Sequence, residues 1–173
     1  MKIQYYVFWF SAYYKNALCS LNFIPHFIES ESDSFGIDID LLEKYFKLKV
    51  FKISIDDFYK TKKQREILSK DKHSLLLTRG VPGTHDIKLA INTVSSLKSG
   101  KKTLLTRFDK STDDRAKVEN SVTVEGPIGL IVLEGWCFGA TPELQGKLAA
   151  PVNELEKQSD PNGVWRHYVN EAL

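Results

Sequence analysis

From about residue 40 onward, the spacing of the apolar residues changes between strand-like and helix-like. The run VFKISI at 50–55 is rich in β-branched and aromatic residues and predicts a buried strand. The run IGLIVL at 128–133 is continuously apolar, which is typical of a buried parallel strand. A helix is expected between them, from about Thr84–Asp86 to Leu97, because Thr84 or Asp86 can cap its first turn.

Four further segments have weaker patterns. Helical spacing favours a helix at 41–46, and the lysine-rich stretch 60–72 indicates a short helix or an ordered loop. Segment 102–108 is expected to be extended, and 109–117 is expected to be a polar loop. Because strands alternate with helices, the pattern predicts an α/β fold with a mostly parallel sheet that is flanked by helices on both faces.

Residues 1–40 differ from the rest of the chain. Nine of the twenty aromatic residues fall within 1–28, and an acidic stretch follows. The apolar core of this segment, 5–14, is shorter than the about 20 residues that a bilayer-spanning helix needs. We therefore expect an edge strand or a buried hairpin. No glycine precedes Gly36, so we do not expect a phosphate-binding loop within 1–28.

The composition is that of an ordinary globular domain. A chain of 173 residues can bury one core, and 42% hydrophobic and 27% charged residues are typical values. The net charge of +2 gives no reason to expect a nucleic acid or an anionic membrane as partner. Cys19 and Cys137 lack the spacing of zinc ligands, and a disulfide between them stays open. Cysteine usage favours the cytoplasm.

Acidic residues follow both predicted strands. Asp56 and Asp57 come after the first strand, and Glu134 comes after the second. The carboxyl ends of parallel strands meet at one edge of a sheet, so these side chains can converge. Converging carboxylates can hold Mg²⁺, and one of them can act as a general base. The alternative is that each acid caps a helix or pairs with a lysine.

The loop TRGVPGTHD carries a cation, a histidine and an acid around two glycines. Gly80 and Gly83 allow tight turns close to a ligand, and Arg79 is suited to bidentate binding of a carboxylate or a phosphate. His85 and Asp86 end the loop. A single loop histidine is more often structural than catalytic, so both interpretations of His85 stay open.

A second loop, TRFDKSTDDR, interleaves basic and acidic residues. Its basic residues are Arg107, Lys110 and Arg115. The segment is either a solvated surface loop or a loop that handles an anionic substrate.

Five motifs together carry a family resemblance. SIDDFY, LLTRGVPGTHD, LTRFDKSTDDR, VEGPIGLIVLEGWCFGA and PVNELE…DPNGVWRHYVNEAL resemble the D-glycerate 3-kinase branch of the P-loop kinases. Uridine kinase, phosphoribulokinase and pantothenate kinase are related to that branch. The resemblance covers about 41–173. It implies a P-loop kinase fold and a function in ATP-dependent phosphorylation of a small hydroxy acid, with D-glycerate as the best candidate.

The resemblance also implies roles for individual residues. Asp56 matches the general base, Glu134 matches the acid that works near Mg²⁺, and both are expected close to the metal. Substrate binding is expected from Asp57, Tyr59, Arg79, His85, Asp86, Arg107, Lys110, Arg115 and Trp136. ATP and Mg²⁺ are the implied cofactors, and a small hydroxy acid is the implied partner. The oligomeric state is not indicated.

The sequence departs from the family in one respect. The family carries a G-x-x-x-x-G-K-[ST] loop before the SIDDFY motif, and no segment of this chain matches it: SGKKT and QGKLA differ in order or in composition. We therefore expect an incomplete kinase domain at 41–173, the acceptor-side half, after an atypical segment at 1–40. The alternative function is a truncated or degenerate remnant that binds a small acid or a protein without turnover. A uridine-kinase-like function is a weaker alternative.

Overall fold

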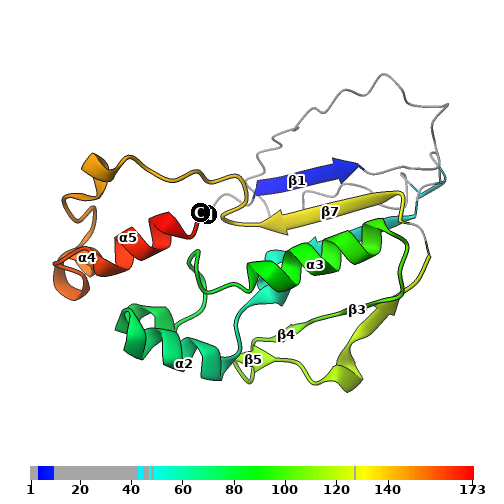
Figure 1. Ribbon diagram of the computed structural model, residues 1–173, viewed down its shortest axis with the longest axis horizontal. Helices are drawn as coiled ribbons and strands as arrows, with labels where there is room; N and C mark the ends of the chain where they lie inside the picture. Colours follow the sequence, from blue (N-terminus) through cyan, green and yellow to red (C-terminus); the bar gives the residue numbers. More distant parts are fainter. Residues whose placement is uncertain (1–3, 10–42, 45–46, 48, 127) are drawn as a thin grey trace.

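The fold is built on a three-stranded sheet. The computed structural model (Figure 1) describes residues 4–9, 43–44, 47, 49–126 and 128–173. The sheet has the strand order β1-β7-β2. Its strands are β1 (Gln4–Trp9), β7 (Leu130–Gly135) and β2 (Val50–Ser54). The central strand β7 runs parallel to β2 and antiparallel to β1, so the sheet combines both kinds of pairing.

Both strands predicted from the apolar runs are present and run parallel in one sheet, as predicted, and the structure shows that they are direct neighbours. Val50 lies opposite Leu130, and Ser54 lies opposite Glu134. This register places the carboxyl ends of β2 and β7 at the same edge of the sheet, which is where open α/β sheets bind ligands.

The aromatic N-terminal segment contributes β1. The expectation of an edge strand is confirmed for Gln4–Trp9, which pairs with the whole length of β7. Its antiparallel direction departs from a purely parallel sheet. The expectations for 10–42 lie outside the described residues, and within 41–46 only Glu43 and Lys44 are described, both helical.

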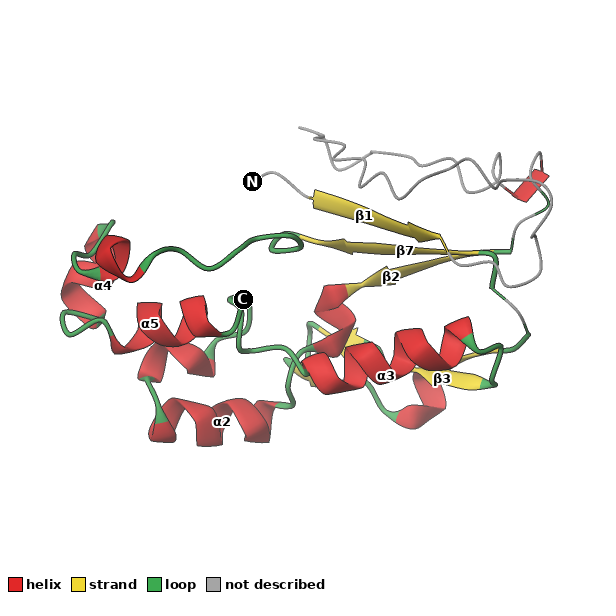
Figure 2. Ribbon diagram, turned by 45° about the horizontal axis from the view of Figure 1, so that its top comes forward, coloured by secondary structure: helices red, strands yellow, loops and turns green. Residues whose placement is uncertain are grey.

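Helix α3 (Ile87–Lys98) covers one face of the sheet, as Figures 1 and 2 show. Ile53 of β2 and Ile131 of β7 point to this face and are buried against Leu97 of the helix. Leu89, Ala90 and Val94 complete the helical side of the core, and Phe58, Leu105, Val124 and Ile128 close its edges. The predicted helix is confirmed: Asp86 is its N-cap, and Gly100, in the left-handed region with φ 70°, follows its end.

The remaining elements extend the molecule beyond the sheet. Two antiparallel pairs, β3 with β6 and β4 with β5, lie on the α3 side, at Thr103–Leu105, Val122–Val124, Phe108–Asp109 and Asp114–Arg115. Three helices gather at the opposite end, namely α2 (Lys62–Asp71), α4 (Glu154–Ser159) and α5 (Val164–Glu171). None of the helices among the described residues is long and apolar enough to cross a membrane.

Sequence patterns missed some of these elements. The segment 109–117 was expected to be a polar loop, but its ends pair as the β4–β5 hairpin. Helices α4 and α5 were not predicted: α4 has a single apolar residue, Leu155, and the helical spacing of the apolar residues in α5 (164, 165, 168 and 169) was overlooked. Asn153 caps α4 through a bond from the Glu156 amide, at 2.9 Å. This capping asparagine is the sequence feature from which the start of α4 could have been predicted.

One buried cation joins several of these segments. Arg65 of α2 is fully buried and donates hydrogen bonds to the carbonyls of Lys60, Leu77 and Asp113. Its guanidinium also pairs with the Asp113 carboxylate at 3.0 Å. A buried guanidinium needs this full set of acceptors, because an unpaired buried charge is strongly unfavourable.

We expect Arg65→Met to lower the free energy of unfolding by about 3 kcal/mol, since it leaves three carbonyls without their donor and removes one of the two cations that pair with Asp113. Urea denaturation followed by circular dichroism measures the change. Lys63→Met is the matched control, because Lys63 is exposed on the same helix and should change stability by less than about 0.5 kcal/mol. Equal losses in the two variants would contradict this role of Arg65.

Candidate functional site

The site begins at the carboxyl end of β2, where the chain enters the tight 3₁₀ turn η1 (Ile55–Phe58). Ser54 caps this turn: its Oγ accepts a hydrogen bond from the Asp56 amide at 3.3 Å. Ile55 and Phe58 are buried, so the turn is anchored on its apolar side. Asp56 and Asp57 are thereby held next to each other on the opposite side.

The β4–β5 hairpin supplies cations to both carboxylates. Arg107 donates to Asp57 at 2.6 Å, and Lys110 donates to Asp56 at 3.0 Å. The amide of Phe108 also donates to Asp57, at 3.2 Å. The side chain of Asp57 is only 15% exposed, whereas that of Lys110 is 64% exposed. Asp57 therefore anchors the hairpin, whereas the ion pair between Lys110 and Asp56 is exposed and weaker.

The loop 78–86 is held from three sides. Lys60 donates to the carbonyls of Gly83 and His85 at 2.6 and 2.7 Å. The indole N–H of Trp136 donates to the Gly80 carbonyl at 2.9 Å, from the turn that follows β7. Gly83 has φ +91°, and a Cβ there would lie 2.4 Å from Cε1 of Tyr168. Glycine is therefore required at this position.

His85 is buried beside the carboxylate turn. Its ring stacks on Tyr59 with centroids 4.3 Å apart, and its Nε2 has no hydrogen-bond partner among the described residues. Burial lowers the pKa of His85 to about 4, although the charge of Asp56 opposes the shift. Burial and the neighbouring Asp56 raise the pKa of Tyr59. Both rings are therefore neutral near pH 7.

Asp86 and Arg115 form an ion pair at 2.8 Å that ties the loop to β5. Asp86 also caps α3 through the Leu89 amide at 3.1 Å, and Arg115 donates to the Tyr59 carbonyl at 3.0 Å. Burial opposes the charge of Asp86, but the hydrogen bonds from Arg115 and Leu89 outweigh it and lower the pKa. In this arrangement both residues hold the architecture of the site together.

Arg79 bonds to Asp113 on the hairpin and lies over the Phe108 ring, with its guanidinium carbon 5.5 Å from the ring centroid. Its side chain is 30% exposed, so one side of the guanidinium stays accessible to a ligand. Asp113 is shared with Arg65, which fixes the carboxylate and through it Arg79.

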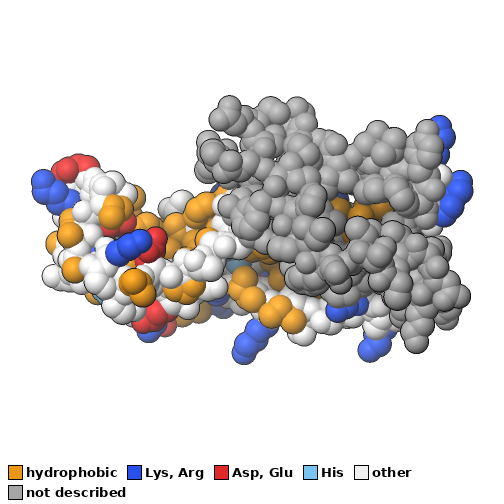
Figure 3. Space-filling view, turned by 90° about the horizontal axis from the view of Figure 1, so that it is seen from above, with side chains coloured by type: hydrophobic (Ala, Val, Ile, Leu, Met, Phe, Trp, Pro, Cys, Tyr) orange, Lys and Arg blue, Asp and Glu red, His pale blue; other side chains and the backbone are white. Residues whose placement is uncertain are grey.

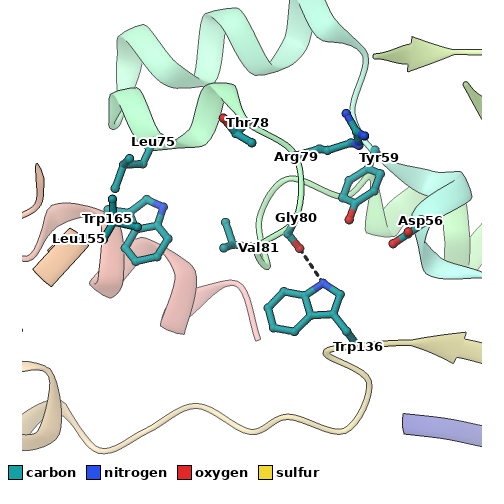
Figure 4. Close-up of a pocket in the computed structure, with 10 residues that line it drawn as sticks. All are labelled: Asp56, Tyr59, Leu75, Thr78, Arg79, Gly80, Val81, Trp136, Leu155 and Trp165. Atoms are coloured by element: carbon teal, nitrogen blue, oxygen red, sulfur yellow. Dashed lines mark hydrogen bonds between the residues drawn. The ribbon is translucent and has the colours of Figure 1, made fainter. Parts of the chain in front are cut away.

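These residues border a cavity of about 510 Å³, shown in Figure 4. Four residues expected to be functional line it: Asp56, Tyr59, Arg79 and Trp136. Gly80 was expected to allow a tight turn close to a ligand, and sequence reasoning missed the other five, which are Leu75, Thr78, Val81, Leu155 and Trp165. Most of these are apolar, and apolar residues at isolated positions resemble ordinary core residues. Only the aromatic Trp165 within the resembling C-terminal motif was a signal that could have been read.

Several expected residues lie elsewhere. We predicted that Asp56 and Glu134 face one cleft, but Glu134 lines neither described cavity and instead pairs with Lys52 at 2.9 Å. The same prediction placed His85 or Asp86 in that cleft. His85 lines a second cavity of about 180 Å³, together with the free thiol of Cys137, and Asp86 lines neither. The acids of the two strand ends thus share a sheet edge without sharing a cavity.

Few side chains of this site could bind a metal ion. Among the described residues, no group of three or more His, Cys, Asp or Glu side chains could hold a metal ion. Mg²⁺ in phosphoryl-transfer sites usually takes only one or two carboxylates, with phosphates and waters as its other ligands. Asp56 fits that limited role, and Glu134 would fit it through water once released from Lys52.

Comparison with known proteins identifies relatives of this chain, although no model of a known protein family matches it. The chain is 40% identical over 114 residues to the chloroplastic D-glycerate 3-kinase of Arabidopsis thaliana. It is 34% identical over 119 residues to TDA10 of Saccharomyces cerevisiae, which is named "Probable ATP-dependent kinase". These matches cover 60% and 61% of this chain, but only 25% and 40% of the relatives.

Solved structures give the same relationship. The D-glycerate 3-kinase of Cryptococcus neoformans superposes with a TM-score of 0.64 at 33% identity, over 78% of this chain and 51% of that protein. The YGR205w protein superposes with a TM-score of 0.56 at 30% identity, over 78% and 49%. The chain thus spans about half the length of these structures. The resemblance to D-glycerate 3-kinase-like P-loop kinases and the α/β fold of that kind are confirmed.

We expect the free energy of unfolding to fall as the pH drops from 6.5 to 4, because unfolded His85 binds a proton in this range and native His85 does not. The displacement of its pKa from 6.5 to about 4 corresponds to a loss of about 3 kcal/mol across the range. Urea denaturation at a series of pH values measures the slope.

In His85→Asn most of this pH dependence should disappear. His167→Asn is the control: it also removes a histidine, from helix α5, and should keep the dependence. A His85→Asn variant with the full slope would show that other groups cause it.

Proposed function

We propose that this chain forms the acceptor-binding side of an ATP-dependent kinase that phosphorylates the hydroxyl of a small hydroxy acid, with D-glycerate as the best candidate. The observation that carries the proposal is the carboxylate of Asp56 at the edge of the cavity, at the carboxyl end of β2, with Arg79 lining the same cavity. This pairs a proton acceptor with a cation for the acid group of the substrate. The relatives named as D-glycerate 3-kinases support the same substrate class.

Asp56 acts in this proposal as the general base. Its carboxylate is 31% exposed, so an acceptor hydroxyl in the cavity can reach it. Asp56 accepts the proton that the hydroxyl loses during transfer, which typically contributes about 10²- to 10⁴-fold to the rate. Lys110 must then move aside from Asp56 or remain hydrogen-bonded to its second oxygen. The exposed lysine can do either at low cost.

Binding of the substrate carboxylate falls to Arg79. Its guanidinium is positioned by Asp113 and by the Phe108 ring, which leaves its orientation fixed before the ligand arrives. The neutral Tyr59 hydroxyl lies on the same side of the cavity, directed toward Asp56 (Figure 4), and can donate to a substrate oxygen.

ATP with Mg²⁺, when bound, supplies the phosphoryl group and neutralises much of its charge. On this chain, Asp56 would face the metal, Glu134 would hold its waters, and Arg107 and Lys110 would lie near the transferring group. We also propose that the protein is cytoplasmic, which its cysteine usage favours.

One observation favours a second candidate, a remnant that binds the acid without turnover. The 173 residues contain no G-x-x-x-x-G-K-[ST] sequence. Backbone N–H groups and the lysine of that loop normally cradle the β- and γ-phosphates. The two candidates share the acceptor site and differ only in turnover.

We expect D-glycerate to bind saturably, and Arg79→Ala to weaken binding by about 10- to 100-fold, since a charge-assisted pair with the carboxylate is lost. Isothermal titration calorimetry measures both affinities. Lys88→Ala is the control, because Lys88 is an exposed cation on α3 that does not line the cavity. Absence of glycerate binding to the wild-type chain, with the fold intact by circular dichroism, would refute the proposed function.

A coupled assay with ATP, Mg²⁺ and D-glycerate separates the two candidates. We expect little or no turnover from these 173 residues, because the loss of even one preorganised donor costs about 10²- to 10³-fold. Turnover that falls at least about 100-fold in Asp56→Asn would exclude the remnant and show that another element replaces the loop.

A further inference from the structure

The cavity has two ends of different chemistry. Figure 4 shows Asp56, Tyr59 and Arg79 gathered at one end, with Gly80 between them and the other end. The far end, which we call the apolar end, is formed by Leu75, Val81, Leu155 and Trp165. It is built by η2 (Ser74–Leu77), α4 and α5, elements in which sequence reasoning placed no functional residue.

The size of the cavity exceeds what the proposed acceptor needs. Cavities of about 300–1,000 Å³ usually hold drug-sized ligands, and this one measures about 510 Å³. D-Glycerate has three carbons. With its hydroxyl at Asp56 and its carboxylate at Arg79, it would occupy one end and leave the apolar end to water. Water against apolar walls is unfavourable, so an apolar group of the ligand would be stabilised there.

Two features of the apolar end suit a ligand. Leu155 is 50% exposed, and Figure 3 shows hydrophobic side chains among charged ones over the end of the molecule that carries α4 and α5. The indole Nε1 of Trp165 is buried and has no hydrogen-bond partner among the described residues. An unpaired buried N–H is costly, and a small rotation of the indole would bring it to an oxygen of a ligand.

We propose that the acceptor of this site is a hydroxy acid with an apolar substituent, which fills the apolar end and places a neutral oxygen against the Trp165 N–H. This inference rests on the proposed function, since it takes the hydroxyl at Asp56 and the carboxylate at Arg79 as given. A neutral oxygen fits better than a second carboxylate, because no cation lines the apolar end within the described part of the chain. Leu155 and Trp165 thus determine specificity.

The test compares D-glycerate with 2-C-substituted glycerates, which keep the carboxylate and the primary hydroxyl. The probes carry a pentyl group or a 4-oxopentyl group of the same length. Each buried methylene is worth about fourfold in affinity, so 2-C-pentylglycerate should bind at least about tenfold tighter than D-glycerate by calorimetry.

Two variants locate the effect. Leu155→Gln should weaken binding of 2-C-pentylglycerate several-fold. Ile91→Gln should not change it, because Ile91 is a similarly exposed apolar residue on α3 that lies outside the cavity. Trp165→Phe keeps an aromatic ring and removes the N–H. It should weaken the 4-oxopentyl probe relative to the pentyl probe by about five- to tenfold, because the buried carbonyl loses its donor.

The outcomes separate this inference from the proposed function. If D-glycerate binds and the substituted acids bind no tighter, the apolar end takes no part and only the inference is overturned. Equal effects of Leu155→Gln and Ile91→Gln would also overturn it. If none of the acids binds to a folded chain, the proposed function fails, and the inference fails with it.

Discussion

The burial of one guanidinium constrains the whole site. Arg65 can lie fully inside the protein only while the carbonyls of Lys60, Leu77 and Asp113 surround it. These carbonyls belong to three separate segments: the chain after the carboxylate turn, the start of the loop that carries Arg79, and the β4–β5 hairpin. If one of them moved away, the buried guanidinium of Arg65 would lose a hydrogen-bond acceptor. The segments are therefore assembled as one unit, and the geometry around Asp56 exists before any ligand binds.

The charges at the surface of this unit are already balanced. Each basic side chain that the sequence marked for anion handling is bonded to an acid of the chain: Arg79 to Asp113, Arg107 to Asp57, Lys110 to Asp56 and Arg115 to Asp86. Exposed ion pairs contribute little to stability, so a ligand can replace the more exposed ones at low cost. The pair of Arg115 and Asp86 is less exposed and holds the loop to the hairpin. The less exposed ion pair thus positions the loop, and the more exposed ion pairs can be replaced by a ligand.

The sequence was sufficient to predict features that depend on local composition. The apolar runs predicted β2 and β7 and their parallel direction in one sheet, and the caps near Asp86 predicted the start of α3. It was not sufficient where partners are distant in the chain. Arg65 resembled any exposed lysine-rich helix residue, because its acceptors lie up to 48 residues away. Glu134 was expected to face one cleft with Asp56, but it pairs instead with Lys52 on the neighbouring strand β2. Trp165 lines the cavity from helix α5, which sequence reasoning overlooked although its apolar residues recur at helical spacing.

The parallel pairing of β2 with β7 has a consequence for how the protein forms during synthesis. Val50 pairs with Leu130, eighty residues later in the chain. Pairing at such separation closes a long loop of chain and is slow compared with helix formation. On the ribosome, Asp56 emerges well before the strand that completes its sheet, so α2, α3 and the hairpin are synthesised while β2 is still unpaired by β7. Until β7 arrives, the apolar side of β2 stays accessible to other chains, and chaperones have most to protect in this interval.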